Sequence, residues 1–173
     1  MKHDDTAKLA RALWSEDGVN LPAAEFKARF DQIYARSEDI DTYWQLGGAL
    51  NDYLGFDPHS FAVPPELATI LLSSSLVDAR IVGLKLLVRH SSNVDLITEW
   101  LCRALQSKRS GELYGGLYEL GNLLDRIQSK QLTALLDVAE FVSILSELKS
   151  SRDAYVREWA QRYIDRLTNA ESG

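Results

Sequence analysis

The chain has 173 residues, of which 46% are hydrophobic and 25% are charged, and its 25 acids against 19 bases leave a net charge of −6. This apolar share excludes a disordered chain, and the length suits a single domain over 1–173. One cysteine excludes an internal disulfide, and the longest charge-free stretch, 67–77, is too short to cross a membrane. The first residues also lack the unbroken apolar run of a secretory signal, so we expect a cytoplasmic protein with no membrane partner.

Apolar residues recur at helical spacing along the whole chain, whereas strand signals are scarce. In chain order, the spacing predicts helices over about 4–16, 22–36, 39–54, 65–73, 75 or 78–90, 93–105, 111–127, 129–136, 138–149 and 152–169. The segment 56–65 holds three of the four prolines and interrupts this pattern. It is therefore a possible sub-boundary within the domain.

Several predicted helices have recognisable ends. Gly18 is expected to stop the first helix, and Gly55 follows the third, where a helix end favours left-handed backbone. Pro22 stands in a favoured first-turn position, and Asn93 and Asp137 are candidate N-terminal caps.

The predicted helices are joined mostly by short turns, which force consecutive helices to pack antiparallel. The chain is therefore predicted to be all-α and built from antiparallel helical hairpins. Two glycine pairs, 47–48 and 115–116, lie inside helical patterns, where they indicate close packing or a kink. Such hairpins form either a compact multi-helix bundle or a stacked solenoid, and internal repeats decide between the two.

Two helices share an arginine followed by a small residue, with an aspartate nearby: Asp153-x-x-Val156-Arg157-x-x-Ala160 and, more weakly, Asp78-Ala79-Arg80 with Gly83. The two arginines are 77 residues apart, near twice the repeat length of ~40 residues of a HEAT unit. The pattern resembles the second helix of a HEAT repeat, which implies a short right-handed solenoid of stacked hairpins. The resemblance also implies that the small residue allows close helix approach and that the Asp and Arg bridge adjacent units. A compact multi-helix bundle remains the alternative.

Signatures of catalysis are missing from the sequence, which has no His and Cys cluster at ligand spacing, no phosphate-binding glycine loop and no nucleophile elbow. Cys102 lies on an amphipathic pattern and is expected to be a small buried apolar residue. Acid pairs such as Asp4/Asp5 stand at predicted helix starts, where capping explains them. We expect no enzyme activity, no cofactor and no metal, with a helical-repeat enzyme using a pocket acid as the third possibility.

Charge is distributed unevenly, with 10 acids against 6 bases over 1–55, 5 against 6 over 56–110 and 10 against 7 over 111–173. A helical-repeat protein that binds nucleic acid needs a basic face, and the only basic cluster here is Arg103, Lys108 and Arg109 near a helix end. The chain is therefore predicted not to bind nucleic acid. Its acidic excess favours a basic protein partner, because opposite charges steer association.

A candidate partner-binding face lies on the helix predicted over 111–127. Tyr114 and Tyr118 stand four residues apart beside the leucine seam, and Asp125 continues their stripe. Glu112 and Glu119 are expected on the polar side of the same helix. Tyrosines beside acids are typical of a protein-binding face.

A second candidate patch, on the helix predicted over 39–54, consists of Tyr43, Trp44 and Asp52, with the acids Glu38 and Asp41. Together these features predict a non-enzymatic protein-binding module. Its most specific form is a small bacterial immunity or antitoxin protein that masks a basic, nuclease-like toxin domain. A HEAT-like scaffold or adaptor for another protein partner is the alternative.

Overall fold

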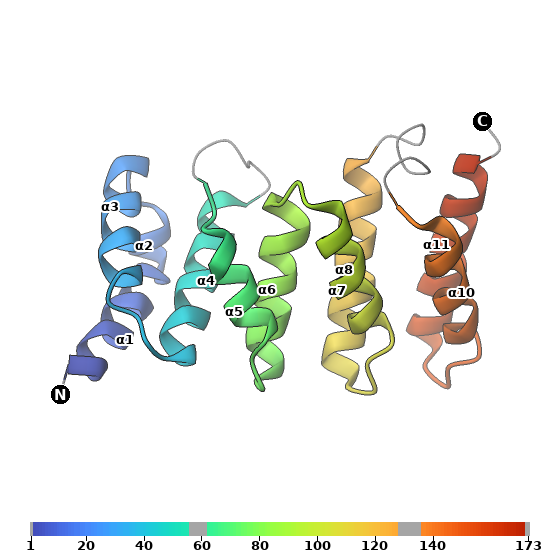
Figure 1. Cartoon of the computed structure of the whole chain (residues 1–173), viewed down its shortest axis with the longest axis horizontal. Helices are drawn as coiled ribbons and strands as arrows, with labels where there is room; N and C mark the ends of the chain where they lie inside the picture. Colours follow the sequence, from blue (N-terminus) through green and yellow to red (C-terminus); the bar gives the residue numbers. More distant parts are fainter. Residues whose placement is uncertain (1, 56–61, 128–135, 172–173) are drawn as a thin grey trace. The chain divides into compact units, whose positions relative to one another are not determined.

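The computed structural model describes residues 2–55, 62–127 and 136–171, and every regular element among them is an α-helix (Figure 1). The helices are α1 (Lys2–Leu13), α2 (Glu16–Val19), α3 (Ala23–Tyr34), α4 (Ile40–Leu54), α5 (Pro65–Leu72), α6 (Val77–His90), α7 (Val94–Leu105), α8 (Ser110–Arg126), α10 (Val138–Leu148) and α11 (Ala154–Glu171). The prediction of an all-α chain is confirmed. Residues 56–61 of the proline-containing segment and 129–135 of one predicted helix lie outside the described residues.

Helix ends follow from the local chemistry that the sequence indicates. The Asn93 side chain accepts a hydrogen bond from the Leu96 N–H at 3.1 Å, and the Asp137 side chain accepts one from the Glu140 N–H at 3.0 Å. Both caps are confirmed. Gly55 has a φ of 52°, the left-handed backbone that favours glycine after a helix.

The predicted helix over 4–16 is confirmed up to Leu13 and is wrong in its last three residues. Helix α1 ends at Leu13, and the chain turns at Ser15 into the separate short helix α2, which contains Gly18. A Cβ at Gly18 would lie 2.2 Å from the carbonyl oxygen of Leu13, so only glycine permits this close return of the chain. Gly18 therefore makes the turn possible rather than ending the first helix.

The chain divides into two compact units, Met1–His90 and Ser91–Gly173. The division falls between α6 and α7, whereas the segment 62–64 that precedes α5 belongs to the first unit.

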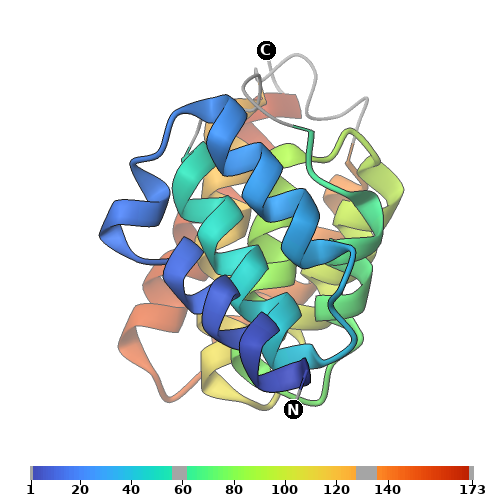
Figure 2. The same cartoon turned by 90° about the vertical axis from the view of Figure 1, so that its left-hand side faces the viewer.

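Helix α4 lies at the centre of the first unit. It packs against α1 on one side and against α5 and α6 on the other, and Figure 2 looks onto α1 and α3 with α4 behind them. A Cβ at Gly48 would lie 2.5 Å from the Trp14 ring, and one at Gly47 would lie 2.6 Å from the Leu71 side chain. The glycine pair 47–48 is therefore a close-packing point with a neighbour on each side, as predicted.

Three hairpins, α5–α6, α7–α8 and α10–α11, share the same turn. Each has a serine, Ser74, Ser107 or Ser151, whose N–H donates to the carbonyl oxygen three residues earlier at 3.0–3.1 Å. The hydroxyl oxygen of the same serine accepts from the N–H two residues later at 3.0–3.2 Å. The serine N–H thus bonds to the end of the first helix, and the serine hydroxyl bonds to the turn that leads into the second helix.

A small residue stands nine positions after each of these serines: Gly83, Gly116 and Ala160. A Cβ at Gly83 would lie 2.9 Å from the Leu71 Cβ, and one at Gly116 would lie 2.9 Å from the Ala104 Cβ. Ala160 is fully buried at the equivalent position. The small residue therefore allows close approach to the first helix at Gly83, as expected, and also at Gly116.

The fourth residue of the second helix closes the turn in two of these hairpins. Arg80 donates to the carbonyl oxygen of Ser74, and Arg157 donates to that of Ser151 at 2.9 Å. The expectation that these arginines bridge adjacent hairpins is wrong for these contacts, because each one binds the turn of its own hairpin. Helix α8 has Leu113 at this position, which cannot donate.

The pairing of α3 with α4 follows the same turn only in part. The Tyr43 hydroxyl takes the place of the arginine and donates to the carbonyl oxygen of Ser37 at 2.6 Å. Nine residues after Ser37, however, stands Leu46, which is fully buried and too large for the close approach seen at the glycines. Helix α4 makes its closest pairing with α1 instead.

Candidate functional site

Helices α8 and α11 of the second unit lie side by side and run in the same direction. Contacts follow one another in the same order along both helices: Tyr114 to Asp153, which precedes α11, Gly121 to Tyr163, and Asp125 to Arg166. The Tyr163 hydroxyl lies only 2.4 Å from where a Cβ of Gly121 would be, so this glycine admits the phenol between the helices.

The two helices carry matching stripes of side chains at intervals of four, three and four residues, which place a stripe along one helix face. We refer to seven of these residues as the tyrosine surface: Tyr114, Tyr118 and Asp125 of α8, and Tyr155, Trp159, Arg162 and Arg166 of α11. Tyr118 is 48% exposed and Tyr155 is 69% exposed, whereas Tyr114 and Trp159 are half-buried. Large aromatic side chains from two helices therefore reach solvent within one unit.

Asp153 attaches the start of α11 to α8. One of its carboxylate oxygens accepts from the N–H groups of Tyr155 and Val156 at the helix N-terminus, and the other accepts from the Tyr114 hydroxyl. The hydrogen bond to Asp153 raises the pKa of the Tyr114 phenol, and the same bond lowers the pKa of the Asp153 carboxyl. Asp153 thus connects two hairpins, the bridging role expected of the aspartate.

At the opposite end of the tyrosine surface, an ion pair joins α8 and α11. Arg166 pairs with Asp125 at 2.8 Å, although 71% of the Asp125 side chain remains exposed. Burial raises the pKa of the Tyr163 phenol beneath them, and the guanidinium groups of Arg162 and Arg166 oppose this rise. Both arginines therefore lie near Tyr163.

The predicted residues of α8 separate into two groups. Tyr114, Tyr118 and Asp125 lie together on the tyrosine surface, whereas Glu112 is half-buried and accepts from the Ser107 hydroxyl. The prediction that Glu119 lies on the polar side of the helix is wrong, because this side chain is fully buried and accepts from the Asn122 amide at 3.0 Å. Helix α8 packs against both α7 and α11, so it buries more of its circumference than a single leucine seam indicates.

The second predicted patch, on α4, is divided by its contacts. Asp52 is exposed and accepts from the Trp14 indole N–H at 2.6 Å, and the Trp14 ring meets the Trp44 ring edge-on at 5.6 Å. Tyr43 instead meets Tyr34 of α3 at 5.8 Å between ring centroids. Trp44 and Asp52 are therefore connected through Trp14, and Tyr43 contacts a different helix.

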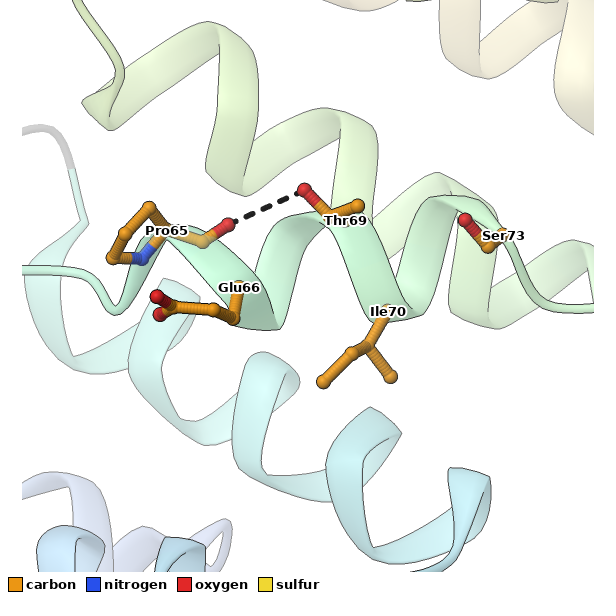
Figure 3. Close-up of a pocket in the computed structure, with 5 residues that line it drawn as sticks. All are labelled: Pro65, Glu66, Thr69, Ile70 and Ser73. Atoms are coloured by element: carbon orange, nitrogen blue, oxygen red, sulfur yellow. Dashed lines mark hydrogen bonds between the residues drawn. The ribbon is translucent and has the colours of Figure 1, made fainter.

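A pocket of about 460 Å³ lies along α5 (Figure 3). Its lining consists of Pro65, Glu66, Thr69, Ile70 and Ser73. These residues offer one carboxylate, from Glu66, the hydroxyls of Thr69 and Ser73, and no histidine or cysteine. The Thr69 hydroxyl, moreover, donates to the Pro65 carbonyl oxygen of its own helix.

Other chemical sites are equally limited within the described part of the chain. No group of three or more His, Cys, Asp or Glu residues there is arranged to hold a metal ion. Cys102 is buried, as predicted, and burial together with Glu140 raises its pKa to about 12, so the thiol stays protonated at neutral pH. None of the described helices combines the length and the apolar character that crossing a membrane requires.

Comparisons with protein-family models, with curated proteins and with solved structures give no significant match to this chain. The assignment of function therefore depends on the geometry of the chain itself.

Sequence reasoning missed the α11 half of the tyrosine surface. Tyr155, Trp159, Arg162 and Arg166 repeat the spacing of the α8 stripe, and this shared spacing is the signal that could have paired them. Trp14, which joins Trp44 to Asp52, had no such signal, because it lies 38 residues before Asp52.

Proposed function

We propose that this chain is a non-enzymatic protein-binding module whose contact site is the tyrosine surface. The observation that carries the proposal is the exposure of Tyr118 and Tyr155 on two helices that Asp153 holds together. Tyrosine, tryptophan and arginine are the residue types that dominate binding energy at protein interfaces, and this surface contains all three. Because Asp153 and Arg166 already hold the two helices, a partner would meet a preorganised surface.

The proposal is tested by placing a photo-crosslinking phenylalanine analogue at position 118 or 155 of the full chain in the source cell. Both positions should crosslink to the same protein. The matched control is Leu76, which is 41% exposed in the first unit and lies outside the tyrosine surface. Equal capture of that protein from position 76, or no protein captured from 118 and 155, would contradict the proposal.

A quantitative test follows once the partner is purified. Tyr118→Ala and Tyr155→Ala should each weaken its affinity by about tenfold or more, as truncation of interface tyrosines commonly does. Leu76→Ala should leave the affinity unchanged.

The more specific form of the proposal is an immunity-type protein that masks a basic, nuclease-like toxin domain. It is supported by the net charge of −6 and by the acidic excess of residues 1–55. A toxin domain encoded beside this chain should form a tight one-to-one complex with it, and co-expression should rescue cells from that toxin. If the chain bound no toxin domain encoded beside it, the immunity-type proposal would be wrong, whereas the general proposal of a protein-binding module would remain.

The alternative form is a scaffold built from degenerate HEAT-like repeats. The recurrence of the turn serine and the small residue in three hairpins supports it. A scaffold would bind its partner without inhibiting a toxin, so the rescue experiment distinguishes the two forms.

A further inference from the structure

The charges of the tyrosine surface are satisfied internally with one exception. Asp125 and Arg166 pair with each other at 2.8 Å. Arg162, by contrast, is exposed and has no ion-pair partner among the described residues. It lies between the aromatic end of the surface and the Asp125–Arg166 pair, close to Tyr163.

Any partner that covers the tyrosine surface would remove water from Arg162. Burying an unpaired guanidinium is strongly unfavourable, so a stable contact must supply an anion opposite it. A carboxylate suits this position because it accepts two parallel hydrogen bonds from a guanidinium. The neighbouring aromatic rings require an apolar contact at the same time, which a lone inorganic anion cannot offer.

We propose that the tyrosine surface binds an amphipathic segment of a protein partner whose apolar side chains cover Tyr118, Tyr155 and Trp159 and whose carboxylate pairs with Arg162. This inference rests on the proposed function and adds the chemistry of the contacting segment. Arg162 follows Tyr155 by seven residues, which is about 10 Å along α11 at ~1.5 Å per residue. A helical segment lying along α11 therefore carries its carboxylate about two turns from the side chain that covers Tyr155.

The tyrosine surface differs in charge from the chain as a whole. The chain as a whole is acidic, yet the one unpaired charge at the centre of this surface is positive. A basic toxin would therefore find its opposite charge on the acid-rich residues 1–55, while the segment seated on α8 and α11 supplies an acid.

The test uses the full chain and two helical peptides of 18 residues with identical leucine faces. At one position bordering that face, the first peptide has Glu and the second has Lys. Binding is followed by NMR, through the ring signals of Tyr118 and Tyr155 and the guanidinium N–H signal of Arg162. We expect the Glu peptide to shift all three sets of signals and to bind at least tenfold more tightly than the Lys peptide.

Two variants check that the difference comes from Arg162. Arg162→Glu should reverse the preference between the peptides, while Arg162→Lys should keep its direction. The matched control is Lys149→Glu, an equal charge change at an exposed position of the same unit, which should leave the preference unchanged.

The outcomes separate the two proposals. Equal binding of both peptides at these residues, or tighter binding of the Lys peptide, would overturn the carboxylate inference and leave the surface as a binding site. A preference unaffected by Arg162→Glu would overturn it as well. If inorganic phosphate alone shifted the same NMR signals equally, the ligand of this surface would be a free anion and the proposed protein segment would be wrong.

Discussion

At the scale of single residues, Asp153 is the most informative side chain. Its carboxylate caps the N-terminus of α11 and accepts the hydroxyl of Tyr114 from α8. One residue thus takes part both in the start of α11 and in its contact with α8. The sequence pattern marked Asp153 as part of a repeat but could not reveal the phenol that binds it, because Tyr114 lies 39 residues away.

Replacing the charge at this position should be visible in the titration of its partner. In Asp153→Asn, the pKa of Tyr114 should fall toward its ordinary value of 10.0, because the carboxylate bond that raises this pKa is lost. NMR of ring-labelled tyrosines at alkaline pH measures the change. Tyr163 is the internal control, because burial is the main cause of its raised pKa, and an equal fall there would contradict the assignment.

The same bond gives the sign of a stability effect at acid pH. The Asp153 pKa is lowered from its ordinary value of 3.8 in the folded chain, so its stabilising contribution is complete above this value. The contribution is lost as the pH falls through the folded pKa. When the pH falls below about 4, the free energy of unfolding of Asp153→Asn should therefore decrease less than that of the unaltered chain. Urea unfolding at each pH measures both.

At the scale of the helical hairpin, the small residue nine positions after the turn serine decides how closely two helices approach. Gly83 and Gly116 each leave no room for a Cβ at an ordinary distance from the facing helix. Leu46 at the equivalent place accompanies the looser pairing of α3 with α4. The recurring element is therefore a turn with a fixed packing distance.

A larger side chain at this position should separate the two helices of its hairpin. Gly116→Val should lower the free energy of unfolding by about 1–3 kcal/mol, because its side chain would be forced against Ala104. Gly111→Ala is the matched control, since this glycine is exposed in the first turn of the same helix. The control should be neutral or stabilising, by up to ~1 kcal/mol. Urea unfolding of both variants measures the difference. An equal loss of free energy of unfolding in the two variants would contradict the packing role of Gly116.

Helix positions were largely predictable, because amphipathic spacing and caps such as Asn93 and Asp137 act over a single turn. The exceptions lie where tertiary contact decides. Glu119 is buried because α8 has a neighbour on two sides, and a periodic pattern reports only the side that carries the leucines. The break after Leu13 depends on the close contact between Gly18 and the Leu13 carbonyl, which composition does not reveal.

At the scale of the whole molecule, the chain consists of two units, each with its own buried leucines and aromatic residues. The sequence predicts a sub-boundary at 56–65, because prolines interrupt the helical pattern there. The division instead falls between α6 and α7, where no proline occurs. Contacts within each unit, rather than the composition of the linking segment, place this division.

Local destabilisation should therefore remain concentrated in the unit where it is introduced. Gly116→Val should speed amide hydrogen exchange in α7, α8, α10 and α11 more than in α4–α6, because it lies in the second unit. Gly83→Val, in the first unit, should give the reverse pattern. Exchange measured by mass spectrometry on both variants makes the comparison, and equal acceleration of both units in each variant would indicate one cooperative block.

The turn geometry also separates two sets of positions in the chain. In the hairpins described here, pairing depends on the turn serine, on the residue six positions later in those that supply a donor, and on the small residue nine positions later. The exposed tyrosines occupy other positions, with Tyr118 eleven residues after Ser107 and Tyr155 four after Ser151. Under the proposed binding function, substitutions that change the contact surface therefore need not touch the residues that pair the helices. A chain organised in this way can vary its exposed tyrosines while its hairpins stay the same.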